Sequence, residues 1–545
     1  MDTTGRVSPA RPVVYPGPVT ELVLGPLLRY VDQSRATVWV ETENPCTVQV
    51  LDATERTFQV GGHHYALLTV HLSGPTPYQV RLDGRVVWPA TGDSPSIIRP
   101  VTSADRLTAL FGSCHFDRPA AGRDRHGPDA LTATAARLAG TPEDERPDLL
   151  LLLGDQVYAD QPTPRVRREL AEHRDLRRPP GGEIADFEEY AILYRHAWQD
   201  PPVRWLLSTL PSMMIFDDHD VRDDWNTSRA WRATMSGAAW WRERLLGGLI
   251  AYWIYQHIGN LDPDVLAADP VYREVREVGR HGDALPVLRD MAARADREQD
   301  GEKGVRWSYA RDLGGVRLVV LDTRCGRILE TGDRAMLSDG EFAWLRDVAA
   351  ADSAHLVLAS SLPWLLPHAV HHLQSWNERA CSGPHAQRAE KLRQAGDLEH
   401  WAAFRDSFDR LAQLIGDRAA RPDAPATISV LSGDVHHSYF AEADYPRPLN
   451  SRVTQLTCSP LHNQAPAFLR APLRAAWSRT PSRLLHRLSH RAGVAPLPLR
   501  WRRTDGPFFG NAIAELDFHG RHAQVTLREA TTDDTLHETC LRQLT

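Results

Sequence analysis

Side chains that can bind metal ions follow four short apolar runs of this sequence. The four segments are 112–115 (GSCH), 154–160 (GDQVYAD), 217–220 (DDHD) and 432–437 (SGDVHH). Thiol, carboxylate, phenol and imidazole groups are all metal ligands, and open α/β folds place their sites beyond the carboxyl ends of their strands. Carboxylates gathered at one edge also repel one another unless cations bind between them. The sequence therefore predicts a metal centre built from four strand ends.

Each segment alone has a simpler explanation. A Gly-Asp pair after a strand is often a turn or a helix cap, and a buried cysteine such as Cys114 is usually an apolar filler. DDHD could be an exposed acidic turn, and VHH a pair of surface histidines. For the simpler explanations to hold, four independent strand ends would have to carry metal-binding residues by coincidence. The four segments together therefore favour the metal centre.

The apolar runs that precede these segments read as buried strands. They span residues 107–111, 148–153, 212–216, 316–321, 355–359 and 427–431. Continuous apolar strands are typical of sheets covered on both faces, and long helical stretches separate them here. We therefore expect a layered α/β domain with mixed sheets.

The chain of 545 residues is too long for one ordinary core. Before residue 100 it alternates apolar and polar residues in short runs, with Asp83-Gly84 as a hairpin turn signal, which is typical of a β-sandwich. We predict an N-terminal β-sandwich domain over 1–103 and a catalytic domain over 104–545. Helical insertions of the catalytic domain are expected at about 226–300 and 366–424.

Residues 468–503 carry many arginines among apolar residues. A basic amphipathic helix can lie on an anionic membrane or a phosphate-bearing substrate. The more ordinary interpretation is a helix whose arginines face water or pair with acidic residues of this acidic protein, and we favour it.

Charge and apolar content exclude several classes of protein. A formal net charge of −7 argues against a general nucleic-acid binder. No apolar stretch reaches the roughly 20 residues of a membrane-spanning helix. The first 30 residues show no signal-peptide pattern, Arg6 and Arg11 are not adjacent, and six scattered cysteines form no CxxC pair. These features predict a cytoplasmic protein.

Six ordered motifs, FGSCHFD, LLGDQVYAD, FDDHDVRDDWN, VVLDTR, LSGDVHH and QLTCSP, resemble those of the PhoD-like alkaline phosphatase family. The resemblance runs from about residue 105 to 530. It implies a metallophosphoesterase fold of two packed β-sheets flanked by helices. It also implies a metal-dependent phosphoesterase that hydrolyses phosphate monoesters, diesters or both.

The resemblance further implies a centre containing ferric iron and calcium, and carboxylate ligands could also hold manganese. Asp155 would bridge the metals, and Tyr158 would bind the ferric ion as tyrosinate. The remaining implied ligands are Cys114, Asp218, Asp434 and His436. The chain departs from the family at Asp223-Asp224, where paired asparagines are common. This departure adds negative charge beside the metals.

The expected mechanism is in-line attack on phosphorus by a metal-bound hydroxide. His219 would donate a proton or a hydrogen bond to the leaving oxygen. Arg324 could bind a phosphate oxygen, or instead form a structural salt bridge with Asp322 or a neighbour.

Three histidines of the second insertion, His368, His371 and His372, could also approach the site. Two other functions stay open. One is a phospholipase-type phosphodiesterase that uses the same centre, and the other is a non-catalytic calcium-binding protein.

Overall fold

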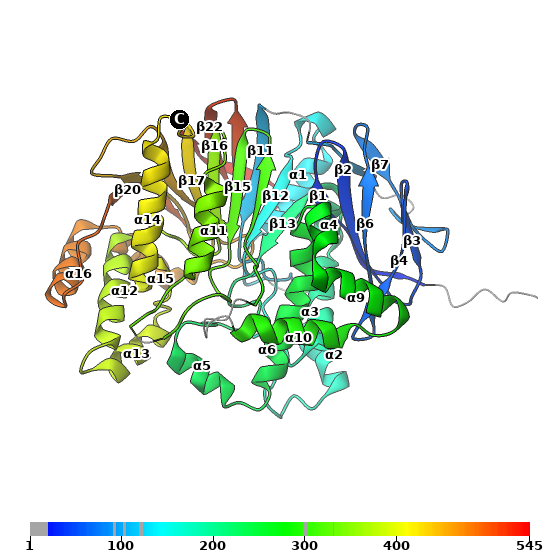
Figure 1. The fold of residues 1–545 in the computed structure, drawn as a ribbon, viewed down its shortest axis with the longest axis horizontal. Helices are drawn as coiled ribbons and strands as arrows, with labels where there is room; N and C mark the ends of the chain where they lie inside the picture. The colour runs from blue at the N-terminus through cyan, green and yellow to red at the C-terminus, as the bar shows by residue number, and fades with distance from the viewer. Residues whose placement is uncertain (1–19, 91–93, 102–104, 119–123, 298–303, 331) are drawn as a thin grey trace, which may run out of the picture.

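The computed structural model describes residues 20–90, 94–101, 105–118, 124–297, 304–330 and 332–545. Figure 1 shows N-terminal sheets at one end, a central α/β part, and helices that cover its faces and its far end. The predicted domain boundary at residue 103 and the segment 1–19 lie outside the described residues.

Two large sheets form the central part. The first has the strand order β13 (Ser212–Ile215), β12 (Leu149–Leu153), β11 (Arg106–Gly112), β21 (Ala512–His519), β22 (His522–Ala530), β23 (Leu536–Gln543). The second has the order β14 (Tyr309–Leu313), β15 (Val316–Leu321), β16 (His355–Ser360), β17 (Thr427–Ser432), β19 (Arg452–Thr457), β18 (Ser438–Asp444), β20 (Arg500–Phe508). The six predicted strands are β11, β12, β13, β15, β16 and β17.

Parallel pairing brings the predicted metal-binding segments to common edges. β11, β12 and β13 are parallel neighbours, with Gly112 opposite Leu152 and Leu153 opposite Ile215. β15, β16, β17 and β19 are also parallel neighbours. Because parallel strands end on the same side, the residues that follow them converge.

The C-terminal strands are the main surprise of the topology. β21 pairs antiparallel with β11 over Arg106 to Phe111, so the end of the chain completes the middle of the first sheet. The mixed character of the sheets agrees with the prediction. The position of β21 had no local signal, since pairing across some 400 residues is decided by tertiary contacts.

The N-terminal part consists of short antiparallel strands. One sheet contains β1 (Leu22–Val31), β2 (Arg35–Thr42), β6 (His63–His71) and β5 (Phe58–Val60). Its partners are the sheet of β4 (Ala53–Arg56), β3 (Thr47–Val50), β8 (Val80–Leu82) and β9 (Arg85–Trp88), and the pair β10 (Ser96–Ile98) and β7 (Thr76–Tyr78). The predicted hairpin turn joins β8 to β9, with positive φ at Asp83 and Gly84.

The first N-terminal sheet is buried on both faces. In β2, Val38 and Val40 enter the N-terminal core, whereas Trp39 between them enters the core of the α/β part. This alternation follows from the two-residue period of a strand. We call the contact between this sheet and the α/β part the seam.

Hydrogen bonds also cross the seam. Arg29, 1% exposed, donates to the Gln256 carbonyl at 2.6 Å and to Asn260 Oδ1 at 3.0 Å. Glu41 accepts from the Tyr255 hydroxyl at 3.0 Å, and His63, 3.0 Å from Glu41 in the same sheet, lies 3.2 Å from Glu188 of the α/β part. Apolar packing and polar pairing together hold the two parts against each other.

Helices cover the sheets and occupy most of the two segments expected to be insertions. The first insertion contains α5 (Arg229–Ser236), α6 (Trp241–Ala251), the π-helix η2 (Tyr252–His257), α7 (Ile258–Asn260), α8 (Pro263–Ala268), α9 (Pro270–His281) and α10 (Leu285–Asp296). The second contains α12 (His368–Cys381), α13 (Ala386–Ala395), η4 (Trp401–Ala403) and α14 (Arg405–Ala420).

The other helices are α1 (Ala130–Ala139), η1 (Glu143–Glu145), α2 (Pro164–His173), α3 (Phe187–Trp198), α4 (Pro201–Thr209), α11 (Asp339–Ala349), α15 (Ala467–Ala476) and α16 (Arg479–Arg491). None of the helices in the described ranges is both long enough and apolar enough to span a bilayer.

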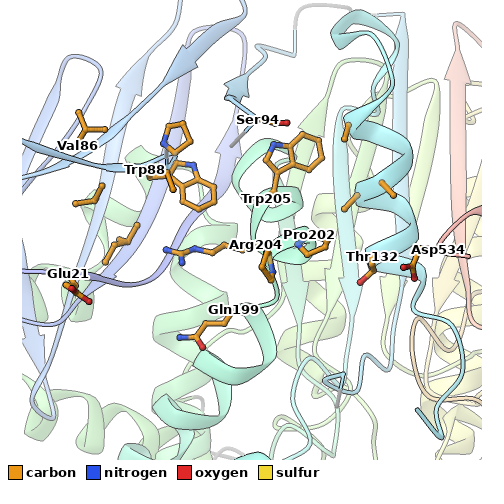
Figure 2. Close-up of a pocket in the computed structure, with 18 of the residues that line it drawn as sticks. Glu21, Val86, Trp88, Ser94, Thr132, Gln199, Pro202, Arg204, Trp205 and Asp534 are labelled. Carbon is orange, nitrogen blue, oxygen red and sulfur yellow. The ribbon is translucent and has the colours of Figure 1, made fainter. Parts of the chain in front are cut away.

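A cavity of about 1000 Å³ opens beside the seam, between β9 and the helices α1 and α4. Figure 2 shows Trp88 and Trp205 facing it from the two parts of the protein. Arg204 covers the Trp88 ring at 4.9 Å. The lining contains none of the predicted metal ligands, so this cavity is separate from the site described next.

Candidate metal centre

The strand ends bring five of the six predicted ligands, all but Tyr158, together in three adjoining groups, which we call the rim. Within each group, one potential ligand atom per residue lies within 4.8 Å of the others. The groups are Cys114, Asp155 and His436; Asp155, Asp218 and His219; and Asp217, Asp218 and Asp434. Asp155 and Asp218 each belong to two groups, so they lie where two cations could share a ligand.

The rim residues have an unusual backbone conformation. Cys114, Asp155, Asp434 and His436 have φ values of 57°, 53°, 66° and 49°. For residues other than glycine, this left-handed region costs on the order of 1–3 kcal/mol each. The turn at each strand end aims these side chains back over the sheet edge.

Glycines before two of these residues permit close packing of the strand ends. A Cβ at Gly154, where φ is 99°, would lie 2.6 Å from Asp217 Cβ. A Cβ at Gly433 would lie 2.0 Å from the Ser113 hydroxyl. The Gly-Asp pairs of the sequence are therefore needed for close approach as well as for a turn.

Cys114 is completely buried beside carboxylates. Its thiol lies 3.4 Å from Asp155 Oδ2 and accepts a hydrogen bond from the Ser459 hydroxyl at 3.3 Å. Burial and then the charge of Asp434 raise the pKa of the thiol to about 12. A bound cation would reverse this preference by stabilising the thiolate.

Asp155 is 1% exposed, and its Oδ1 has no hydrogen-bond partner among the described residues. Burial and the neighbouring Cys114 raise the pKa of this carboxyl well above its usual value. Its backbone N–H donates to Asp220 Oδ2 at 2.9 Å. A buried carboxylate oxygen without a donor is costly, and a cation is the partner that fits it.

Asp434 is held by a residue that the sequence analysis missed. His400 Nε2 lies 2.8 Å from Asp434 Oδ2, and Gln374 contacts the other ring nitrogen of His400 at 2.8 Å. Burial opposes ionisation of Asp434, but His400 and Arg324 outweigh it and keep the pKa below its usual value. His400 lies in the second insertion, where no strand-end signal marks it.

Arg324 lies under the rim and is 0% exposed. Its guanidinium forms ion pairs with Asp217, Glu399 (2.5 Å), Asp218 (3.3 Å) and Asp434 (3.8 Å). This geometry favours a structural salt bridge over a phosphate clamp. The expected partner, Asp322, is not one of these side-chain partners; its carboxylate accepts the Arg324 backbone N–H instead.

His219 and Tyr158 lie side by side, with ring centroids 4.6 Å apart. His219 Nδ1 contacts Asp160 at 3.0 Å, while its Nε2 is 3.7 Å from the partly exposed Asp223. Burial opposes protonation of His219, but the carboxylates of Asp160 and Asp218 outweigh it and raise the pKa well above its usual value.

The Tyr158 hydroxyl accepts from Asn463 Nδ2 at 3.0 Å. Burial, with Cys114 and Asp155, raises its pKa. His436 has the opposite shift, since burial lowers its pKa to about 4. It is therefore neutral at pH 7, which is the form that binds metal.

The three histidines of α12 are not brought to the rim. His368 Nε2 contacts the Trp501 carbonyl at 2.9 Å, and His371 packs on Phe408 and Trp501 at 4.9 Å. His372 packs on His486 of α16 at 4.9 Å. These positions serve packing between α12 and the C-terminal elements.

A second cluster near the rim, His115, Asp129 and His462, also has metal-ligand spacing. Its members, however, bind one another, the backbone or the Asp124 side chain. His115 Nε2 lies 3.2 Å from Asp129, which also accepts the Leu131 N–H, and His462 Nε2 lies 2.9 Å from Asp124. These hydrogen bonds cap α1 and fix the loop after β19.

Comparison with known proteins gives the family and the fold of the chain. A family model described as PhoD-like phosphatase matches residues 133–487. Another, described as a domain of unknown function (DUF7800), matches residues 19–100. No curated protein matches the sequence.

Two solved structures extend the comparison. A structure of PhoD matches with a TM-score of 0.55 and 12% identity, over 96% of this chain and 92% of that one. The structure of purple acid phosphatase PPD1 from yellow lupin (Lupinus luteus) seeds matches with a TM-score of 0.46 and 10% identity, over 95% of this chain and 73% of that one. The likeness to PhoD confirms the predicted fold class of two packed sheets flanked by helices beside an N-terminal all-β part.

Proposed function

We propose, since the chain belongs to the PhoD-like phosphatase family, that this metal-dependent phosphoesterase hydrolyses phosphate monoesters, diesters or both at the rim. The observation that carries the proposal is the convergence of Cys114, Asp155, Asp218 and Asp434 from separate strand ends. The orphaned Asp155 Oδ1 supports a cation at their meeting point.

We infer that the cations are ferric iron and calcium, with manganese as a possible replacement for calcium. A thiolate and a phenolate are strong anionic donors, so Cys114 and Tyr158, with His436, suit a trivalent ion. Asp218 and Asp434 offer the oxygens that calcium prefers, and Asp155 would belong to both sites. When bound, the cations would activate water as the nucleophile and neutralise charge on the phosphate.

The protein's own groups would position and protonate the substrate. Because Asp160 engages His219 Nδ1, the Nε2 atom is the one available to donate to the leaving oxygen. Asp160 would thereby orient the imidazole. Arg324 would balance the charge of the carboxylates and fix their directions, since it is too buried to serve as an open phosphate clamp.

Metal analysis of the purified protein, paired with a substrate screen, tests the proposal. We expect bound iron and calcium, turnover of p-nitrophenyl phosphate or its bis-ester, and a visible charge-transfer band that Tyr158→Phe removes. Bound metal without turnover of either ester would favour the calcium-binding protein instead. A colourless enzyme of full activity would exclude tyrosinate bound to iron.

Phosphodiester hydrolysis on lipids is a second candidate function. It is favoured by one observation, the exposed arginines of α15 and α16, which continue from the loop that touches Cys114 and Tyr158. The ratio of rates on the bis-ester and the monoester separates the two preferences.

A further inference from the structure

The helices α15 and α16 concentrate positive charge in an otherwise acidic protein. Between residues 467 and 491 there is no aspartate or glutamate, whereas the net charge of the chain is −7. The arginines of the two helices are Arg470, Arg474, Arg479, Arg483, Arg487 and Arg491. Together with the exposed apolar residues described next, we call them the basic face.

Large apolar side chains are exposed on the same two helices. Phe468 is 75% exposed and Leu484 is 68% exposed, and they are the two most exposed large apolar side chains among the described residues. Leu469 and Leu488 are each 40% exposed. Grouped apolar exposure beside charge marks an interaction surface rather than ordinary surface variation.

The arginines of the basic face do not pair with acidic residues. Among the described residues, no salt bridge involves any of the six, whereas Arg405 and Arg410 of nearby α14 pair with Asp409 and Asp339. Five of the six are exposed and Arg470 is half-buried, so these arginines face water, which is the first of the two arrangements expected for this segment. Arg474 instead covers the Phe509 ring at 4.8 Å.

The basic face rests on a packed support. His486 of α16 packs on His372 of α12 at 4.9 Å, and Trp477 between the helices packs on Tyr439 at 5.1 Å. Leu484 and Leu488 are thus left outside while α16 is held against α12. Figure 1 shows α16 at the end of the molecule opposite the N-terminal sheets.

A short connection joins the basic face to the rim. The loop after β19 carries Ser459, which donates to Cys114, and Asn463, which donates to Tyr158. α15 begins at Ala467, four residues after Asn463. The start of α15 is therefore only a few residues along the chain from contacts to Cys114 and Tyr158.

We propose that the basic face docks the protein on an anionic lipid membrane. Arginines would meet the lipid phosphates while Phe468 and Leu484 enter the boundary with the acyl chains, as in interfacial amphipathic helices. Because Phe468 and Leu484 add an apolar part, a bilayer fits this face better than a soluble anionic polymer. The proposal does not depend on the phosphoesterase activity.

Vesicle flotation tests the docking. The full chain is mixed with vesicles of phosphatidylcholine alone, or of phosphatidylcholine with phosphatidylglycerol, at low and high salt. We expect flotation with the anionic vesicles only, and weaker flotation at high salt because salt screens the attraction between the arginines and the lipid phosphates. No flotation with anionic vesicles would overturn the proposal.

Two variants separate charge from apolar contact. Arg479→Gln/Arg483→Gln/Arg487→Gln should weaken vesicle binding about 100-fold, since each arginine near an anionic surface contributes roughly fivefold. Phe468→Ser/Leu484→Ser should weaken it about tenfold or more, because buried apolar area is lost. Both should hydrolyse a soluble ester at the wild-type rate, which separates docking from catalysis.

A matched control uses exposed residues away from the basic face, Arg165→Gln/Arg168→Gln/Arg177→Gln and Val265→Ser, which should float as wild type. Equal loss in the control would overturn the proposal. Soluble polyphosphate would also overturn it, if it competes with vesicles and binds the Phe468→Ser/Leu484→Ser variant as tightly as the wild type. Self-association abolished by the same variants would identify a second copy as the partner and would also overturn it.

Discussion

Charge is buried at both the seam and the rim, but it is balanced in different ways. At the seam, Arg29 donates to carbonyl and amide oxygens, and Glu41 accepts from Tyr255 and His63. At the rim, carboxylates face other carboxylates, and several of their oxygens have no donor among the described residues. The charged groups of the seam thus find protein partners, although Arg29 Nε and Trp39 Nε1 have none among the described residues, whereas the carboxylates of the rim face one another and would gain partners from bound cations.

Replacing the shared rim carboxylate should have the largest effect. Asp155→Asn should lower kcat/KM on the order of 10⁴-fold, because both proposed cations would lose their shared ligand. Metal content should fall as well. Without metal, the variant should melt at a higher temperature than wild type, since the buried Asp155 carboxyl, whose ionisation is opposed by burial and by Cys114, is replaced by an uncharged amide.

Asp129→Asn is the matched control, because this buried carboxylate is bonded to His115 and the start of α1. It should retain metal but lose about 3–5 kcal/mol of stability. If Asp155→Asn retained metal and activity while Asp129→Asn lost them, the distinction between the two clusters would be wrong.

His219→Ala should come next. We expect kcat to fall about 10²–10³-fold with unchanged metal content, because the donor to the leaving oxygen is removed but no ligand is. The loss should be greater for an alkyl phosphate than for p-nitrophenyl phosphate, whose leaving group needs less protonation. Equal losses on both substrates would argue against proton donation.

His400→Gln should weaken metal binding about 10–100-fold, because Asp434 loses the imidazole that orients it. Saturating metal should restore most of kcat. His372→Gln, in the same insertion but on the α16 side, should leave metal affinity unchanged. Titration of the apoprotein with calcium measures both.

The seam should respond to pH through His63. Burial opposes its protonation, but Glu188 and Glu41 outweigh this and raise the pKa of His63 to about 9. A raised pKa gives stability that is present below about pH 6.5 and lost as the pH rises through 9. His63→Gln should therefore lower the free energy of unfolding at pH 6 by up to about 3 kcal/mol, seen as a lower Tm, and have little effect above pH 9.5. A Tm difference independent of pH would contradict this.

The strand ends of the rim could be predicted because their signal is local. Each buried strand is a continuous apolar run, and Cys114, Asp155, Asp218 and Asp434 follow such runs within a few residues. The ordered motifs then supported the family and the fold. The hairpin at Asp83-Gly84 was readable for the same reason.

The missed features depend on contacts distant in sequence. His400 and Glu399 lie in a helical insertion, and nothing local distinguishes His400 from His368 or His371. Their roles follow only from how α12 and η4 pack on the second sheet. Similarly, β21 alternates apolar and polar residues like an edge hairpin, yet it lies in mid-sheet beside β11.

The left-handed backbone at Cys114, Asp155, Asp434 and His436 has a consequence for laboratory evolution. Glycine at any of these positions would relax the chain and remove a buried or half-buried polar group. Screens that reward only heat resistance of the metal-free protein would therefore enrich such replacements and erase the enzyme. Selection for turnover has to be applied in every round to keep these strained residues of the rim.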